Sequence, residues 1–148
     1  MKYLKKNGTG SLENDPLTEK VIGLAIGIHK ELGSGFLESI YHRALEIELA
    51  EAGIFFVSEA PLSVKYKNRI LGTFEADLII ENKLLVELKA LEILSVNTEI
   101  QVVNYLKASR LEVGLILNFG TSPLQIRRKY RDPLSLDVDL RLHEATSS

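Results

Sequence analysis

The chain has 148 residues, of which 45% are hydrophobic and 26% are charged, an ordinary composition for one globular domain. It contains no cysteine, which excludes disulfide bonds, thiolate zinc sites and thiol catalysis. The net charge of −2 argues against a uniformly basic nucleic-acid binder, and neither a membrane-spanning run nor a signal-peptide stretch is visible, so we expect a cytoplasmic protein without membrane contact.

The first half of the chain predicts two helices after a polar lead-in over residues 1–14. Asp15 followed by Pro16 is typical of a helix start, with the aspartate as N-cap and the proline in the first turn. Hydrophobic residues then recur at helical spacing until Gly33 ends the pattern. These residues are Leu17, Val21, Leu24, Ile28 and Leu32. A second helix is predicted from about residue 36 to residue 52.

The remainder of the chain predicts a sheet and one more helix. The strands of a meander are expected at about 62–66, 70–80 and 84–90, with turns at 67–69 and 81–83. A helix at 98–109, a buried strand at 113–118, a short element at 124–131 and a frayed tail at 132–148 follow. The order α-α-β-β-β-α-β predicts a single α/β domain over residues 15–131 with a mixed central sheet.

Two acidic residues and a lysine interrupt the hydrophobic strands of this meander. Asp77 lies in the second strand, and Glu87 and Lys89 share one face of the third, because side chains alternate along a strand. Charges at such positions are costly to desolvate unless they are paired or bind a metal. Asp77 and Glu87 share a face only if the hairpin loop has an odd length, and a three-residue loop at 81–83 places them directly opposite each other.

A divalent cation between opposed carboxylates converts their repulsion into ligation. The hard oxygen ligands favour Mg²⁺ or Mn²⁺. Lys89 would then stabilise charge on a phosphoryl oxygen or help to activate a water molecule. Strand alternation alone supports an alternative equally well, namely an exposed aspartate and a surface ion pair between Glu87 and Lys89.

Two motifs together resemble a known family. The segment Gly35-Phe36-Leu37-Glu38-Ser39-Ile40-Tyr41 fits the pattern GxxExxY and follows His29-Lys30-Glu31-Leu32-Gly33. Asp77, followed one hairpin later by Glu87-Leu88-Lys89, resembles the core of the PD-(D/E)XK nuclease superfamily. Over about residues 17–131 the chain therefore resembles a GxxExxY protein, a small family placed in that superfamily.

The resemblance implies a restriction-endonuclease-like α-β-β-β-α-β core with a mixed sheet, and metal-dependent hydrolysis of DNA or RNA. Lys89 would be the catalytic lysine, and Glu38 would complete the site from the second helix. In one departure, Ala76 stands where the superfamily has a proline that performs no chemistry. The implied metal ligands are Asp77, Glu87 and the carbonyl oxygen of Leu88.

Four further side chains have both a functional and a structural interpretation. Gln101 and Tyr105 share a helix face and resemble the QxxxY motif of the RecB-like branch, with Gln101 orienting a water or phosphate and Tyr105 contacting substrate. Tyr105 could equally pack its helix on the sheet. His29 and Tyr41 are expected to support the site structurally rather than to perform chemistry.

The favoured function is a Mg²⁺- or Mn²⁺-dependent nuclease acting on nucleic acid. Two alternatives remain open: a catalytically silent module that binds nucleic acid or a protein partner, and a structural homodimer. Basic residues gather in two places, which charge alone assigns to a solvated turn and a solvated tail. These residues are Lys65, Lys67 and Arg69, and then Arg127, Arg128, Lys129 and Arg131.

Overall fold

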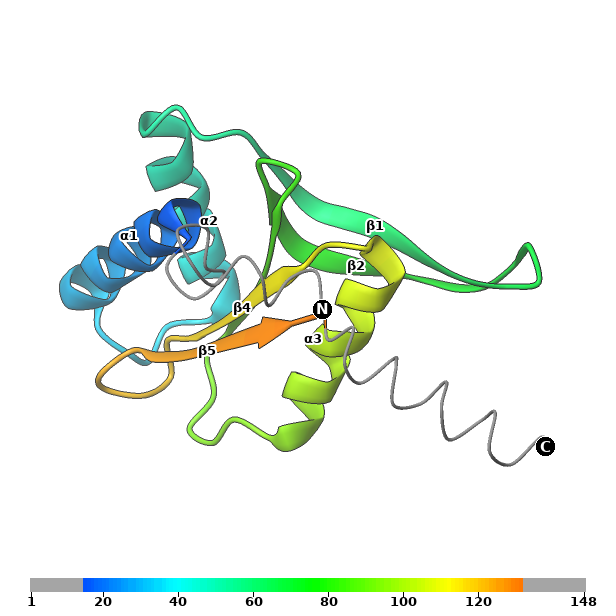
Figure 1. Cartoon of the computed structure of the whole chain (residues 1–148). Coiled ribbons are helices and arrows are strands. Elements are labelled where there is room, and N and C mark those ends of the chain that lie inside the picture. Colours follow the sequence, from blue (N-terminus) through cyan, green and yellow to red (C-terminus); the bar gives the residue numbers. More distant parts are fainter. Residues whose placement is uncertain (1–14, 132–148) are drawn as a thin grey trace.

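The computed structural model describes residues 15–131, so the predicted lead-in (1–14) and tail (132–148) lie outside the described residues. Within this range the chain alternates helical and extended segments in the order ααβββαββ (Figure 1). The elements are α1 (Pro16–Leu32), α2 (Glu38–Glu51), β1 (Phe56–Tyr66), β2 (Arg69–Ile80), β3 (Leu84–Lys89), α3 (Val96–Ser109), β4 (Val113–Asn118) and β5 (Gln125–Tyr130).

The strands of the described chain form one mixed sheet in the order β1-β2-β3-β4-β5. β3 and β4 run parallel, and the other neighbouring strands run antiparallel. A parallel pair needs a crossover connection, which α3 provides. The predicted α/β fold with a mixed central sheet is therefore confirmed, and the short element expected at 124–131 is the edge strand β5.

Local chemistry sets the limits of the first two helices. The Asp15 carboxylate accepts a hydrogen bond from the Thr18 backbone N–H at 3.0 Å, as the N-cap prediction required. Gly33 ends α1 at a φ of +70°, a backbone conformation that glycine adopts without strain. α2 begins at Glu38, two residues later than predicted, because Leu37 is extended (φ −67°, ψ 151°).

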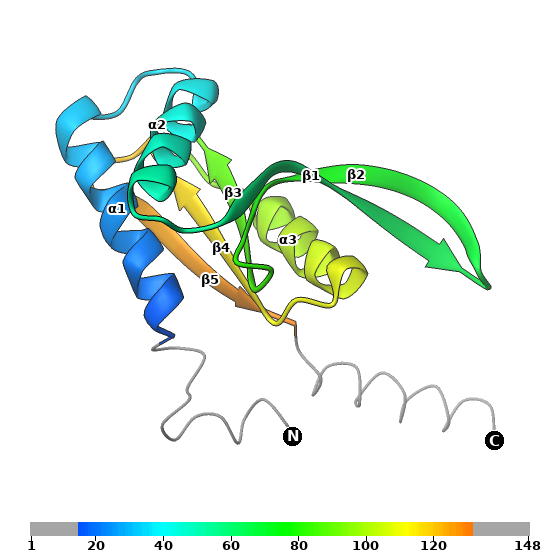
Figure 2. The same ribbon diagram turned by 90° about the horizontal axis from the view of Figure 1, so that it is seen from above.

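The helices cover both faces of the sheet, with α1 and α2 on one side and α3 on the other (Figure 2). The hydrophobic core is accordingly divided in two by the sheet. The cluster on the α1 and α2 side includes Val21, Ala25, Tyr41, Leu45, Leu78, Ile80, Val86, Leu88 and Leu117. The cluster on the α3 side includes Leu62, Ala76, Leu85, Val102, Leu106 and Ile116, with Phe74 and Tyr105 packed against it.

β1 and β2 form a long hairpin that extends past the rest of the sheet and curves beside α3, which we call the arm (Figure 2). β1 begins earlier than the predicted strand at 62–66. The prediction was too short because Glu59 (φ +50°) and Pro61 interrupt the alternation that marks a strand in the sequence. A proline is tolerated in β1 because β1 lies at the sheet edge.

Strict alternation along β2 predicts that Phe74, Ala76, Leu78 and Ile80 share one face of the sheet, and this prediction is wrong. Leu78 and Ile80 pack with α1 and α2, whereas Phe74 and Ala76 pack on the α3 side. The change of side occurs at Asp77, where β2 leaves β3 and the arm begins. Among residues 15–131, no helix is long and hydrophobic enough to cross a membrane.

Candidate active site

The β2–β3 hairpin satisfies the geometric condition for a shared carboxylate site. Ile80 pairs with Leu84, so the connecting loop has three residues, Glu81 to Lys83. Two of them, Glu81 and Asn82, take positive φ angles of 54°, and the Lys83 N–H donates to the Ile80 carbonyl oxygen at 2.9 Å. The odd loop length places Asp77 and Glu87 on the same face of the sheet.

Asp77 and Glu87 hold each other at the point where β2 and β3 separate. Backbone pairing of the two strands ends at Leu78 and Val86. Beyond that pair, the Asp77 N–H donates to Glu87 Oε1 at 3.0 Å, and the Leu88 N–H donates to Asp77 Oδ2 at 2.7 Å. The carboxylates thus replace the regular ladder between the strands, and each is fixed by a backbone N–H of the other strand.

The opposite side of Asp77 is irregular as well. β1 pairs with β2 on either side of Asp77, but Glu59, which would face it, is not among the paired residues and has a φ of +50°. Irregular backbone of this kind re-aims a strand and its side chains. The sheet is therefore distorted on both sides of one residue, the aspartate that carries the proposed chemistry.

The two carboxylates disfavour each other's charge. Glu87 is only 5% exposed, and its pKa is raised to about 8, first by burial and then by the neighbouring Asp77 carboxylate. A hydrogen bond between the Glu87 and Asp77 carboxyl groups raises this pKa further. A cation bound beside Glu87 would offset the part of this shift that comes from the Asp77 charge.

Glu38, Lys89 and Tyr105 lie in the same electrostatic neighbourhood. Burial, followed by the Asp77 carboxylate, raises the pKa of Glu38 at the first turn of α2. The positive charge of the Lys89 ammonium lowers the pKa of both Glu38 and Glu87 and so offsets part of the increase. Burial, followed by Glu87 and Asp77, raises the pKa of the Tyr105 phenol. Residues from α2, β2, β3 and α3 therefore converge on one place.

The GxxExxY segment forms a braced loop that leads into Glu38. The Tyr41 hydroxyl donates to the Gly33 carbonyl oxygen at 2.6 Å and accepts from the Phe36 N–H at 3.1 Å. The Tyr41 ring is buried and stacks on Phe119, with ring centroids 4.4 Å apart. Because these contacts fix the residues before α2, they also fix where α2 begins and where Glu38 projects.

His29 provides a second connection on the same side of the sheet. Its Nε2 atom lies 2.8 Å from the Thr121 carbonyl oxygen, and its ring lies 6.1 Å from that of Phe119. These contacts join the end of α1 to the loop after β4. The supporting roles expected for His29 and Tyr41 stay predictions. Leu88 is buried in the core, so only its backbone faces the site.

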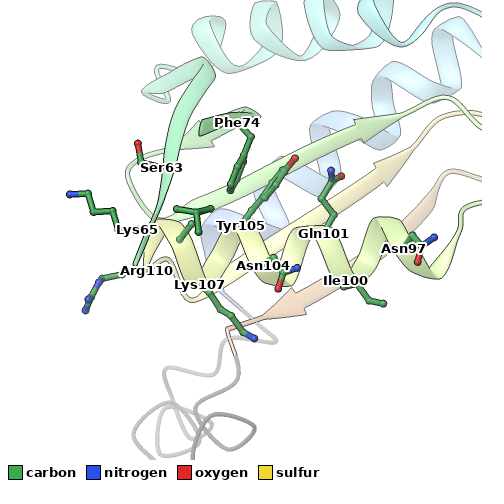
Figure 3. A pocket seen from close by; sticks show the side chains of 12 residues that line it. Ser63, Lys65, Phe74, Asn97, Ile100, Gln101, Asn104, Tyr105, Lys107 and Arg110 are labelled. Atoms are coloured by element: carbon green, nitrogen blue, oxygen red, sulfur yellow. The ribbon is translucent and has the colours of Figure 1, made fainter. Parts of the chain in front are cut away.

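Gln101 and Tyr105 lie on the side of α3 that faces the arm (Figure 3). Tyr105 stacks on Phe74 of β2, with ring centroids 4.1 Å apart and ring planes at 18°. The structural interpretation of Tyr105 therefore holds, because the ring packs α3 against the arm. Its phenol group nevertheless lies close enough to Asp77 and Glu87 to respond to their charge.

Two further polar features escaped the sequence analysis. Asn118, at the end of β4, is fully buried. Its side-chain amide accepts a hydrogen bond from the Leu91 N–H at 2.9 Å and donates one to the Leu91 carbonyl oxygen at 3.0 Å. These two bonds fix the chain just after Lys89. In the sequence, Asn118 stands as an amide at the end of a hydrophobic run, in the segment Leu117-Asn118-Phe119, which also fits the resemblance to the GxxExxY proteins. His42 and Glu46 of α2 contact Ser58 of β1, and only the spacing of four residues on α2 hinted at that cluster.

The residues present fit a Mg²⁺ or Mn²⁺ ion. No three His, Cys, Asp or Glu side chains converge on a ready-made metal site within residues 15–131. Mg²⁺, however, keeps several waters and commonly takes only one or two protein carboxylates. Asp77 and Glu87 supply two, fixed by backbone N–H groups. Burial raises the pKa of Glu87, and the Asp77 charge raises it further, a contribution that a cation would offset.

Comparisons with known proteins agree with this geometry. A family model described as the PD-(D/E)XK nuclease superfamily matches residues 15–129. Among solved structures, the chain is similar to the crystal structure of SSO0001, with a TM-score of 0.50 and 19% sequence identity, which shows a likeness of fold alone. The match covers 73% of this chain and 56% of that one, so this chain spans little more than half of that protein. Comparison with curated proteins gave no match.

Proposed function

The chain belongs to the PD-(D/E)XK nuclease superfamily, and on this basis we propose that it is a divalent-metal-dependent nuclease that hydrolyses phosphodiester bonds of DNA or RNA. One observation carries the proposal: the Asp77 and Glu87 carboxylates are fixed face to face where β2 and β3 separate, beside Lys89. The finer assignment to the GxxExxY proteins and to the RecB-like branch rests on the motifs and belongs to the same proposal.

Asp77, Glu87 and the Leu88 carbonyl oxygen would hold Mg²⁺ or Mn²⁺. When bound, the ion supplies Lewis-acid activation of the scissile phosphate and of the attacking water. The chain's own contribution begins with orientation, because the Leu88 N–H and the Asp77 N–H fix both carboxylates before any ligand arrives. Preorganised groups of this kind need no rearrangement during the reaction.

Lys89 would stabilise the negative charge that develops on a non-bridging phosphoryl oxygen. Glu38, whose raised pKa brings it closer to neutral pH, would accept the proton of the attacking water while the bond from phosphorus to the leaving oxygen breaks. Gln101 and Tyr105 would contact the substrate from α3, with Gln101 orienting a water or a phosphate oxygen. Tyr41 would keep Glu38 in place through the braced loop, and His29 would support the site by joining the end of α1 to the loop after β4.

Cleavage assays with defined variants test the proposal. The purified protein is incubated with single- and double-stranded DNA and RNA, with Mg²⁺, with Mn²⁺ or with EDTA. Asp77→Asn and Lys89→Ala should each lower cleavage by about a hundredfold or more, the order seen when one preorganised charge-stabilising group is removed. Lys83→Ala, an exposed position in the same hairpin, is the matched control and should cleave normally.

The outcomes distinguish the proposal from its alternatives. Activity that survives both active-site substitutions comes from a contaminant or from another site, and refutes the proposal. Calorimetry with Mn²⁺ reports on the metal site independently of cleavage. Mn²⁺ binding that Asp77→Asn abolishes, without cleavage of any substrate, would favour the catalytically silent module.

A further inference from the structure

A groove runs between the arm and α3 (Figure 3), and its residue Tyr105 lies within electrostatic reach of Asp77 and Glu87. It has a volume of about 890 Å³. Residues from β1, β2 and α3 line it, including the stacked pair Phe74 and Tyr105. We propose that this groove binds one strand of a nucleic acid, so that the chain acts on single-stranded substrate. This inference rests on the proposed nuclease function and adds the form of its substrate.

The charge of the groove differs from that of the whole chain. Its lining includes Lys65, Lys107 and Arg110 and no acidic residue of the described chain, although the protein carries a net charge of −2. None of these three basic residues forms an ion pair with another residue in the range 15–131. Two basic residues of β5 differ, since Arg128 pairs with Glu19 and Lys129 pairs with Glu99. The unpaired positive charge therefore suits a phosphate backbone.

The polar groups of the groove are ordered along its length. α3 runs antiparallel to β3, because it crosses over from the end of β3 to the start of the parallel strand β4. Arg110 accordingly lies near Leu84 at the start of β3, far from Lys89 at its end. Tyr105 is placed between them and senses the charge of the catalytic carboxylates. A strand would thus extend from the carboxylate pair past Tyr105 towards the basic end.

The width of the groove favours one strand over two. From Asn97 to Arg110 the helix rises about 20 Å at about 1.5 Å per residue. Spread over that length, the volume corresponds to a mean cross-section of roughly 45 Å². A cross-section of this size suits one strand better than a duplex, whose major groove alone is about 12 Å wide.

The side chains of the groove also match those that bind unpaired nucleotides. Binding sites for single strands combine basic residues along the backbone with aromatic rings for the bases. Here Phe74 and Tyr105 form an aromatic wall, and Asn97, Gln101 and Asn104 add amide donors and acceptors along α3. In a duplex, stacking covers the base faces and pairing covers the Watson–Crick edges, so these groups are free for contact only in a single strand.

Binding without cleavage tests this inference. A labelled oligonucleotide of about 12 nucleotides, as DNA and as RNA, is titrated in EDTA by fluorescence anisotropy, alone and as a duplex. We expect the single strand to bind at least tenfold more tightly than the duplex. Three phosphate contacts predict a slope of log K against log salt of about −2, which is about a 20-fold loss of affinity between about 50 and 200 mM salt.

Matched variants locate the site. The triple change Lys65→Ala, Lys107→Ala, Arg110→Ala should remove most of the salt dependence and lower single-strand affinity by about tenfold or more. A control that replaces three exposed basic residues on the opposite layer should leave both unchanged. The replaced residues are Lys20, Lys30 and Arg43. Lys107→Glu alone, at an exposed position, gives a second test that does not depend on the triple variant folding.

The result distinguishes this inference from the nuclease proposal. Three results would overturn the inference. The first is that the duplex binds as tightly as the single strand or more tightly, and the second is that the groove substitutions leave single-strand affinity unchanged. The third such result is that the protein binds an acidic peptide and no oligonucleotide. If the groove binds a strand that is never cleaved, the inference stands and the nuclease proposal fails. If the protein cleaves nucleic acid but the groove substitutions leave the cleavage rate unchanged, the nuclease proposal stands and the inference about the groove fails. Equal affinity for DNA and RNA would identify the phosphate backbone and the bases, rather than the sugar, as the recognised groups.

Discussion

Replacing Glu87 by glutamine should stabilise the metal-free protein at alkaline pH. The pKa of Glu87 is raised from 4.5 to about 8 by burial and by Asp77. Between these values the folded protein holds a proton that the unfolded chain has lost, so the free energy of unfolding falls as pH rises through this window and levels off above it. Glutamine cannot ionise, keeps an oxygen to accept from the Asp77 N–H, and offers an N–H to the Asp77 carboxylate.

The shift sets the size of the effect. A pKa shift from 4.5 to about 8 corresponds to about 5 kcal/mol of unfolding free energy. This value is an upper limit, because buried charges behave as if the effective dielectric constant around them were about 20, which weakens their interactions. We therefore expect Glu87→Gln to be about 2 kcal/mol more stable than the wild type at about pH 9 and equal to it near pH 4. Because whole domains are stable by only about 5–15 kcal/mol, such a difference is easily measured.

Urea unfolding in EDTA across this pH range provides the measurement, with Glu92→Gln as a matched change at an exposed acid. Mn²⁺ should then raise the stability of the wild type at neutral pH and leave Glu87→Gln almost unchanged, since a ligand stabilises only the state that binds it. The reasoning is refuted if the wild type loses no stability between about pH 5 and 9, or if the variant is the less stable protein at the alkaline end.

Three further changes probe the supports of the site, each by urea unfolding. Asn118→Ala should cost about 2–4 kcal/mol, because it leaves the backbone groups of Leu91 without their buried partners, and a loss below about 1 kcal/mol would contradict that reading. Tyr41→Phe keeps the ring stack but removes both hydroxyl contacts, and should cost about 1–2 kcal/mol; an unchanged stability would mean that the hydroxyl does not brace the loop. Gly120→Ala should prevent stable folding, since a Cβ atom there would lie 2.3 Å from the Leu91 backbone. Gly27→Ala, in an open helical position, should instead stabilise by about 0.5–1 kcal/mol.

The sequence was most informative where a single local rule decides the outcome. An odd hairpin loop places Asp77 and Glu87 on one face, and the structure has the predicted three-residue loop. The N-cap at Asp15 follows from residue chemistry in the same way. What periodicity could not reveal is the break in pairing at Asp77, because carboxylates that replace backbone partners leave no pattern in the sequence.

The arm and Asn118 show the other limit of sequence reasoning. The length of β1 was underestimated because Glu59 and Pro61 disrupt the alternation, yet an edge strand tolerates both. Lys65 was assigned to a solvated turn, since its chain neighbours gave no sign that α3 would lie opposite. Asn118 satisfies the backbone at Leu91, 27 residues away, and such a contact depends on the finished topology.

The separation of charge between the groove and the carboxylate pair would allow an acidic protein to bind a polyanion. The Asp77 and Glu87 carboxylates, which act on Tyr105, would repel a phosphate, whereas Lys65, Lys107 and Arg110 in the groove would attract the same backbone. In EDTA a strand is therefore held mainly by the basic end, which gives a small number of salt-sensitive contacts. A divalent cation at the carboxylate pair would turn repulsion into attraction there, so cation and strand must each strengthen the binding of the other by the same factor. Ca²⁺, which binds hard oxygen ligands, should thus tighten single-strand binding in the wild type and lose this effect in Asp77→Asn.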